Sequence, residues 1–130
     1  MKMPTRPPSL SQWKEYIGIT QQLLSDVKKL KVLEADEDGI EHLTYGDYRA
    51  DPALSVRFAE ALAFVVVTVG IDKVGEVLQI SKTSAGQWLN HENHSPVRLR
   101  VIESATALMC DWALKNCPQQ TTILIADNDQ

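Results

Sequence analysis

The stretch from Gly70 to Asn90, GIDKVGEVLQISKTSAGQWLN, constrains the fold of this chain more than any other. Its apolar residues recur at helical spacing on both sides of Ile80, which predicts two short helices joined by a tight turn. Gly75 fits a position where two helix backbones cross closely, and Ser81 can cap the second helix. This is the pattern of a helix-turn-helix, whose second helix can enter the major groove of DNA. An ordinary helical hairpin within a core is the alternative.

The residues able to touch DNA are the polar ones on the outer face of this second helix. Amide side chains can form two hydrogen bonds to adenine, hydroxyls reach bases or phosphates, and lysine reaches guanine or phosphate. The face carries no acid, whereas a merely soluble face commonly carries Glu and Lys. The predicted contacts are Ser81, Lys82, Thr83, Ser84, Gln87 and Asn90, followed by Arg98 and Arg100 as phosphate clamps. Solvated surface arginines are the alternative for the last two.

An earlier stretch, LSQWKEYIGITQQLLSDVKK at residues 10–29, repeats the pattern. Aligning Gly18 with Gln79 superposes the apolar positions of the two stretches, so we predict a second helix-turn-helix with Gly18 in the turn and Ile19 filling it. Chance is the alternative, because all amphipathic helices share a period. Asp26 opposes DNA contact here. The outward residues that could contact DNA are Thr20, Gln21, Gln22, Ser25, Lys28 and Lys29.

An acidic hairpin follows this first unit. Asp38-Gly39 is a strong turn signal between strand candidates at residues 31–35 and 40–43, so the pair would form a wing. Its tip should repel phosphates, and we expect a structural role. The acids are Glu34, Asp36, Glu37, Asp38 and Glu41.

Two long helices are predicted from a cap followed by proline. Asp51-Pro52 begins one that ends at Gly70 and is apolar on nearly every side, which indicates a buried spine. Ser95-Pro96 begins another, which ends near Asn116. Their core-facing residues are predicted to be Val56, Ala59, Leu62, Ala63, Val66 and Val69, then Val97, Val101, Ile102, Ala105, Leu108, Met109 and Trp112.

The run TTILIA at residues 121–126 reads as a strand that needs a partner. The wing and the same strand of a second subunit are the available partners. We expect the second, and hence a homodimer built through this strand and the helix before it, with Val101, Leu108, Met109 and Trp112 in the interface.

Composition restricts the class of protein further. With 130 residues, 44% of them apolar and 6% aromatic, the chain can form one compact helical unit or two small ones sharing a core. The net charge is −4, but residues 1–31 and 71–100 are net basic and could face DNA while the acidic segments turn away. Residues 1–9, with three prolines, predict a flexible arm.

Catalytic and metal chemistry find little support in the sequence. Cys110 and Cys117 are about 10 Å apart along a helix, too far for a disulfide, so reduced thiols and a cytoplasmic location are expected. His91 and His94 lack the close cysteine pair of structural zinc sites, and we predict no metal, no cofactor and no enzyme activity. The most apolar run, residues 62–71, is too short to span a bilayer, so no membrane partner is expected.

The segment from Gly70 to Ala107 resembles the Cro/lambda-repressor-like family of phage and plasmid regulators, on the residues VGEVLQISKTSAGQWLNHENHSPVRLRVIE. The resemblance implies that the recognition helix reads a groove through Lys82, Thr83, Ser84 and Gln87. The chain departs from the family at Gln79, where glycine is usual, and at His91, where a basic residue is usual. Residues 11–47 are similar to the winged helix-turn-helix of MerR-like regulators and of some phage terminase small subunits.

We therefore predict a mainly α-helical protein with tandem helix-turn-helix units, a small β-hairpin wing and a short C-terminal strand. Its expected parts are a flexible arm (1–9), a winged helix-turn-helix (10–50), a Cro-like helical domain (51–116) and a dimerisation strand with tail (117–130). The expected function is sequence-specific binding of double-stranded DNA, as a cytoplasmic transcriptional repressor rather than an activator. The alternatives are a phage DNA-packaging subunit of the terminase type and a protein-interaction module that does not bind DNA.

Overall fold

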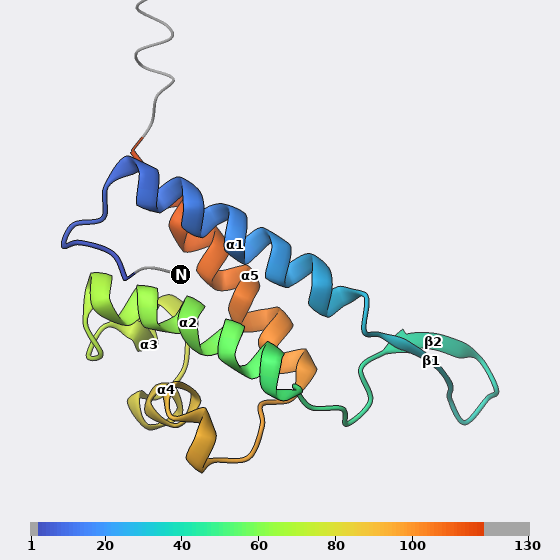
Figure 1. The fold of residues 1–130 in the computed structure, drawn as a ribbon. Coiled ribbons are helices and arrows are strands. Elements are labelled where there is room, and N and C mark those ends of the chain that lie inside the picture. Colours follow the sequence, from blue (N-terminus) through green and yellow to red (C-terminus); the bar gives the residue numbers. More distant parts are fainter. Residues whose placement is uncertain (1–2, 119–130) are drawn as a thin grey trace, which may run out of the picture.

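Helices make up most of the chain, and a small hairpin projects from one end of the helical bundle (Figure 1). The computed structural model describes residues 3–118, and in them the mainly α-helical class with a small hairpin is confirmed. The predicted strand at 121–126 lies outside the described residues. The elements in order are α1 (Leu10–Lys28), β1 (Val32–Ala35), β2 (Glu41–Thr44), α2 (Pro52–Val69), α3 (Val74–Leu78), α4 (Lys82–Leu89), a 3-10 turn (His91–Asn93) and α5 (Leu99–Asn116).

The helix α1 runs without a break through Gly18, so the first predicted helix-turn-helix is wrong. A capping box starts it, in which the Ser9 hydroxyl accepts from Gln12 N–H at 3.1 Å and the Gln12 side chain accepts from Ser9 N–H at 2.9 Å. Ile19, expected to fill a turn, is an ordinary half-buried helical residue. Thr20 has the chemistry of a cap, but its hydroxyl donates back to carbonyls of the preceding turn, so Gly18 does not end the helix while α1 packs along α5.

The segment before α1 is folded against the bundle in its described part, where a flexible arm was predicted. Pro4 and Pro8 are buried. The Thr5 hydroxyl donates to the Pro7 carbonyl at 2.8 Å and also contacts the Gln12 side chain at 2.9 Å. Residues 3–9 thus belong to the structure that caps α1.

The acidic hairpin forms as predicted. β1 and β2 pair antiparallel, with Leu33 opposite Leu43, and nearly every strand residue is exposed. At the tip, the Asp36 carboxylate accepts from the N–H groups of Asp38 and Ile40, each at 2.9 Å. The hydrogen bond from Ile40, followed by one with the His42 side chain, lowers the pKa of Asp36. The hairpin is therefore held by its own turn and touches the bundle only at its base.

The helix α2 starts and ends where the sequence predicts. The Asp51 carboxylate accepts from Leu54 N–H at 2.7 Å, and Gly70 ends the helix with a φ of 89°. The helix contacts α1, α3, α4 and α5, as expected of a spine, and buries Phe58, among others. Val56 was predicted on the core side, but its side chain is 44% exposed. By length and composition alone, α2 would also suffice to cross a membrane.

The helix α5 begins at Leu99, and the predicted start at Ser95-Pro96 is wrong. Tertiary pairing holds the residues before it extended. Ala50 N–H donates to the Val97 carbonyl at 2.9 Å, and Leu99 N–H donates to the Tyr48 carbonyl at 3.0 Å. The predicted end at Asn116 is confirmed.

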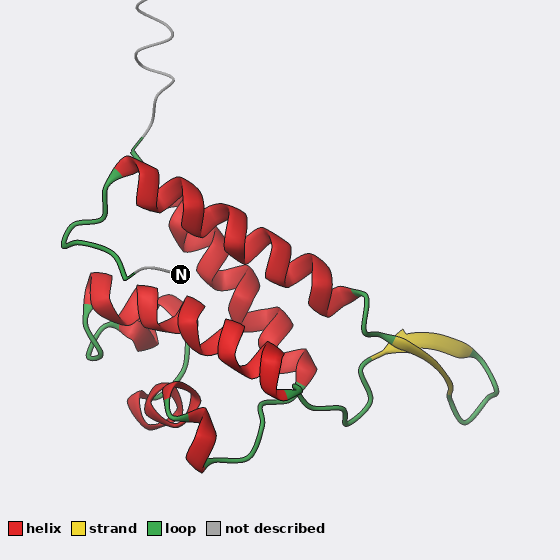
Figure 2. Ribbon diagram, viewed as in Figure 1, coloured by secondary structure: helices red, strands yellow, loops and turns green. Residues whose placement is uncertain are grey.

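One hydrophobic core joins the helices α1 to α5, so a domain boundary at residue 50 runs through shared packing. Figure 2 shows these helices gathered in one bundle. At one end of it, the rings of Tyr16 and Phe64 stack with centroids 3.8 Å apart, and Trp112 contacts Trp13 at 5.1 Å. These aromatic residues come from α1, α2 and α5 and hold the three long helices together.

The unbroken α1 predicts that Gly18→Ala stabilises the protein. A Cβ at Gly18 would meet no atom within 4 Å, and alanine in a helix interior is favoured over glycine by about 0.5–1 kcal/mol. Urea unfolding followed by circular dichroism measures the change. A loss of stability would instead indicate a turn with positive φ at this residue.

Candidate nucleic-acid interface

The helices α3 and α4 form the predicted pair with a tight turn between them. Gln79 adopts the left-handed conformation, with φ 58° and ψ 42°, and its N–H donates to the Gly75 carbonyl at 2.7 Å. A Cβ on Gly75 would lie 2.6 Å from the carbonyl oxygen of Ile80. The close approach at Gly75 is thus confirmed, although the crowding backbone belongs to the turn. A side chain in this left-handed conformation costs Gln79 about 1 kcal/mol relative to glycine.

The cap and the inner face of α4 fix its orientation. The Ser81 side chain accepts from Ser84 N–H at 3.0 Å, and the two hydroxyls lie 3.1 Å apart. Ala85 is fully buried, and the Trp88 ring contacts Phe58 of α2 with centroids 5.4 Å apart. Ser81 and Ser84 therefore hold the helix start, whereas the side chains left on the outer face are Lys82, Thr83, Gln87 and Asn90.

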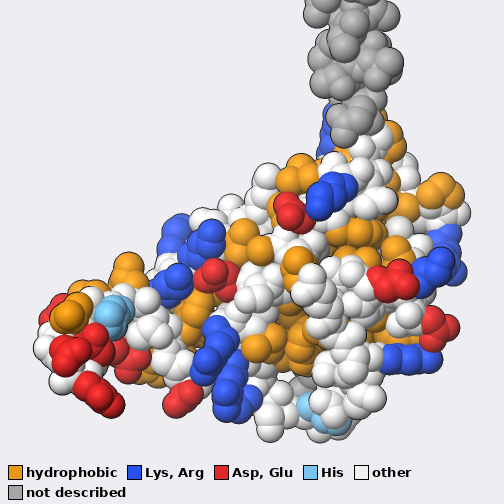
Figure 3. Space-filling view, turned by 180° about the vertical axis from the view of Figure 1, so that it is seen from behind, with side chains coloured by type: hydrophobic (Ala, Val, Ile, Leu, Met, Phe, Trp, Pro, Cys, Tyr) orange, Lys and Arg blue, Asp and Glu red, His pale blue; other side chains and the backbone are white. Residues whose placement is uncertain are grey.

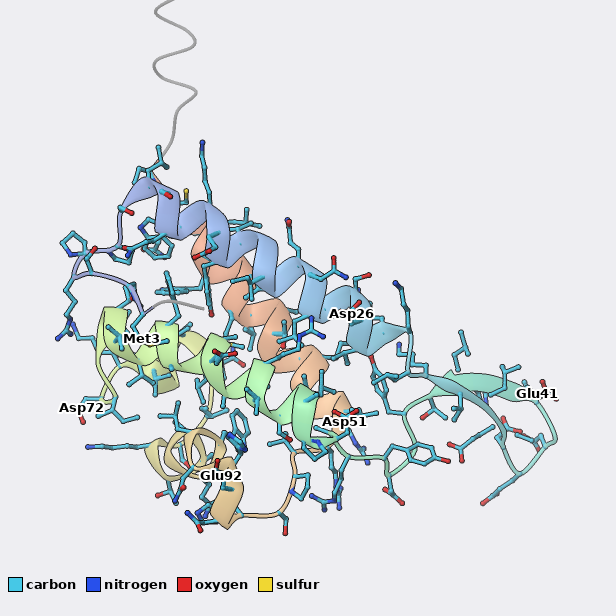
Figure 4. The ribbon with its side chains drawn as sticks, in the orientation of Figure 1. Met3, Asp26, Glu41, Asp51, Asp72 and Glu92 are labelled. Carbon is cyan, nitrogen blue, oxygen red and sulfur yellow. The ribbon has the colours of Figure 1, made fainter. Side chains whose placement is uncertain are left out.

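An acid lies beside this face, which sequence analysis did not anticipate. Lys82 Nζ is 2.6 Å from the Asp72 carboxylate, and the two side chains are 64% and 81% exposed. The hydrogen bond from Lys82 lowers the pKa of Asp72. Water screens an ion pair this exposed, so Lys82 can exchange Asp72 for another anion at small cost. Figure 4 shows Asp72 next to the loop that leads into α3, on the side of the molecule that carries α4.

A groove of about 320 Å³ joins α4 to the segment before α5. Gln87 lines it from α4, and His94 and Arg98 line it from the other side. Arg49 reaches the same segment, because it forms an isolated antiparallel β-bridge with Arg98. Its guanidinium donates to the Pro96 carbonyl at 2.6 Å. Arg49 was missed by sequence reasoning, since only the long-range bridge places it there.

The predicted clamp residue Arg100 lines different hollows from Arg98. It lies 3.6 Å from Asp47 and borders a hollow at the base of the hairpin, with Tyr45 and Glu103. There Tyr45 donates a hydrogen bond to Glu103, while burial and then that carboxylate raise the pKa of Tyr45. Of the two predicted clamps, the structure brings only Arg98 into the α4 groove.

The candidates on α1 do not join this surface. Thr20 is fully buried and its hydroxyl donates to the Tyr16 and Ile17 carbonyls, each at 3.0 Å, so its predicted contact with DNA is wrong. Gln22 is hydrogen-bonded to Asp26, which also pairs with Arg57. The predicted candidates that remain exposed on α1 and its C-cap are Gln21, Gln22, Ser25, Lys28 and Lys29.

The helices α1 and α4 lie on opposite sides of α2 in Figure 1 and share no contact within the described residues. The acidic hairpin is also remote from α4, and Figure 3 shows its carboxylates grouped at the projecting end. The structure therefore offers one candidate surface, made of the outer face of α4 with Arg98 and Arg49, and a separate set of polar residues on α1.

Metal-binding side chains do not gather in the described part of the chain. No group of three or more His, Cys, Asp and Glu residues there could hold a metal ion. Cys110 and Cys117 are both free. Comparisons of the chain with protein-family models, curated proteins and solved structures find no match.

The crowding at Gly75 predicts that Gly75→Ala destabilises the protein by about 1–3 kcal/mol, since the Ile80 carbonyl would have to move. Gly86→Ala is the control, because Gly86 in α4 has no neighbouring atom within 4 Å of a built Cβ. Thermal unfolding of the two variants measures the difference. Equal melting temperatures would contradict the close approach.

Proposed function

We propose that this protein is a sequence-specific regulator that binds double-stranded DNA through α4, as a repressor of the phage or mobile-element type. The observation that carries the proposal is the outer face of α4, which is capped, exposed and free of acids along the helix itself. Reduced Cys110 and Cys117 are compatible with a cytoplasmic location, where such a regulator meets DNA.

The residues proposed to read bases project from one side of α4. Thr83 and Gln87 are exposed, and Lys82 is held only by an exposed pair with Asp72. Gln87 can offer an amide donor and acceptor to an adenine edge, and Lys82 can reach guanine or a phosphate. Ser81 and Ser84 are proposed to lie beside a phosphate bound at the N-terminus of α4, where the backbone N–H groups favour an anion. Asn90 lies at the opposite end of the helix.

Contacts with the phosphates of the DNA are assigned to Arg98 and Arg49. Arg98 lines the groove beside Gln87, and Arg49 is tied to the same extended segment through the Pro96 carbonyl. Because that segment is paired with residues 48–50, both arginines start from a fixed backbone. Phosphate contacts of this kind set the register of a recognition helix without reading sequence.

The contribution of α1 is proposed to be smaller. Lys28 and Lys29 are exposed, but they lie across α2 from α4 and near the acidic hairpin. A duplex seated on α4 would meet them only if it bent or if a second protein copy were involved.

A protein-interaction module without DNA binding is the second candidate. It is favoured by the pairing of Lys82 with Asp72 and by the net charge of −4, both of which reduce attraction to phosphates. Selection of bound sites from a random duplex pool separates the two. An enriched site whose binding weakens steeply with salt supports the regulator, and recovery of no site contradicts it.

For the selected site, we predict that Gln87→Ala costs about 1–3 kcal/mol of binding free energy, because a base would lose a bidentate partner. Gln21→Ala on α1 is the matched control and should bind like the parent protein. Fluorescence anisotropy at fixed salt measures both. A larger loss from the α1 variant would move the interface to that helix.

Removal of an arginine should change the salt dependence of DNA binding rather than its sequence specificity. Arg98→Ala and Arg49→Ala should each weaken selected and random duplexes alike and reduce the slope of log K against log salt by about 1. Lys115→Ala, at the exposed far end of α5, is the control. An unchanged slope would exclude the tested arginine from phosphate contact.

A further inference from the structure

The outward face of α5 carries two hollows that meet. One of about 260 Å³ lies between α5 and the α3–α4 pair, and one of about 460 Å³ lies between α5 and α1. Ser104 and Leu108 border both, so the two hollows form one strip along the helix. Figure 3 looks onto the side that carries α5 and α3 and shows hydrophobic side chains gathered there.

This strip shares only Val101 and Leu108 with the dimer surface predicted from sequence. Met109 is fully buried in the core of its own subunit, and Trp112 contacts Trp13 and Phe64. The predicted place of Met109 in an interface is therefore wrong, whereas the half-buried Trp112 lies in the aromatic cluster and does not line the strip. Val101 and Leu108 are only half-buried, and they line the strip together with Leu24 of α1.

We propose that a second copy of this chain covers the strip, with the two α5 helices packed antiparallel about a two-fold axis near Ser104 and Leu108. The charges at the two ends of the strip are the reason for choosing a second copy as its occupant. Arg100 borders one hollow and Asp111 borders the other, about 16 Å apart along the helix. An antiparallel pair places each Arg100 beside the partner's Asp111, so the strip is complementary to itself.

The side chains between these charges suit a close helix pair. Ser104 and Ala107 are small and exposed, which lets two helices approach to the usual 8–10 Å between axes. Leu108 can then pack across the small side chains of the facing helix.

Both charged residues are available for such a contact. Arg100 has Asp47 at 3.6 Å, but the two side chains are 57% and 92% exposed, so water screens the pair. Asp111 is exposed and makes no ion pair with any residue of the described part of the chain. Exchange of Asp47 for the partner's Asp111 at the end of the strip therefore costs Arg100 little.

This dimer is independent of the proposed function, since it is measured without DNA. Sedimentation equilibrium of the full-length protein should show a dimer at micromolar concentration. Leu108→Glu should raise the dimer dissociation constant at least tenfold. Leu114→Glu is the control, because Leu114 is 46% exposed on α5 but borders neither hollow. Circular dichroism must show both variants folded.

A charge exchange tests the antiparallel geometry. Arg100→Glu and Asp111→Arg should each weaken the dimer, and the double variant should restore it, since the pair is rebuilt with reversed signs. Asp47→Asn should have little effect. A monomeric parent protein, an unchanged L108E dimer or a double variant weaker than both single ones would overturn the proposal. A chain ending at Pro118 that dimerises when the full chain does not would also overturn it, by assigning the strip to residues 119–130.

Discussion

The stacked rings of Tyr16 and Phe64 are the contact on which the rest of the structure depends. Their planes differ by 10°, and the Tyr16 hydroxyl donates to the Ala61 carbonyl at 2.7 Å, so α1 is fixed to α2 in position and rotation. Burial raises the pKa of Tyr16 and keeps this donor protonated. Trp112 closes the cluster from α5, which in turn carries the hairpin through Glu103. The α3–α4 pair joins the same core through Trp88.

Elements whose signals are local were predicted correctly. Asp51 and Ser81 cap their helices, Gly70 ends one, and Asp38-Gly39 forms a turn, because each needs only its own backbone neighbours. The whole α3–α4 pair could be read from the sequence for the same reason. Its outer face followed from the helical period, and the exposed positions of Thr83 and Gln87 are as expected.

Errors arose where tertiary contacts override a local signal. Gly18 indicates a turn by its residue type alone, but an unbroken α1 is stabilised by packing along α5. The continuous helix places Thr20 in the core. Ser95-Pro96 reads as a helix start, but pairing with residues 48–50 keeps the next residues extended. The same pairing brings Arg49 beside Arg98. No spacing within the sequence reveals a bridge between residues so far apart.

The exposed hairpin has a further consequence for how the protein behaves at high concentration. A two-stranded ribbon leaves unpaired backbone groups along both outer edges, and Leu33 and Leu43 add apolar side chains that are 62% and 65% exposed. Such an edge is a template for strands of other molecules and hence for aggregation. Glu34 and Glu41 lie within the strands, and the tip adds three more acids. Charge that discourages contact with DNA thus also protects the ribbon from growing into a larger sheet.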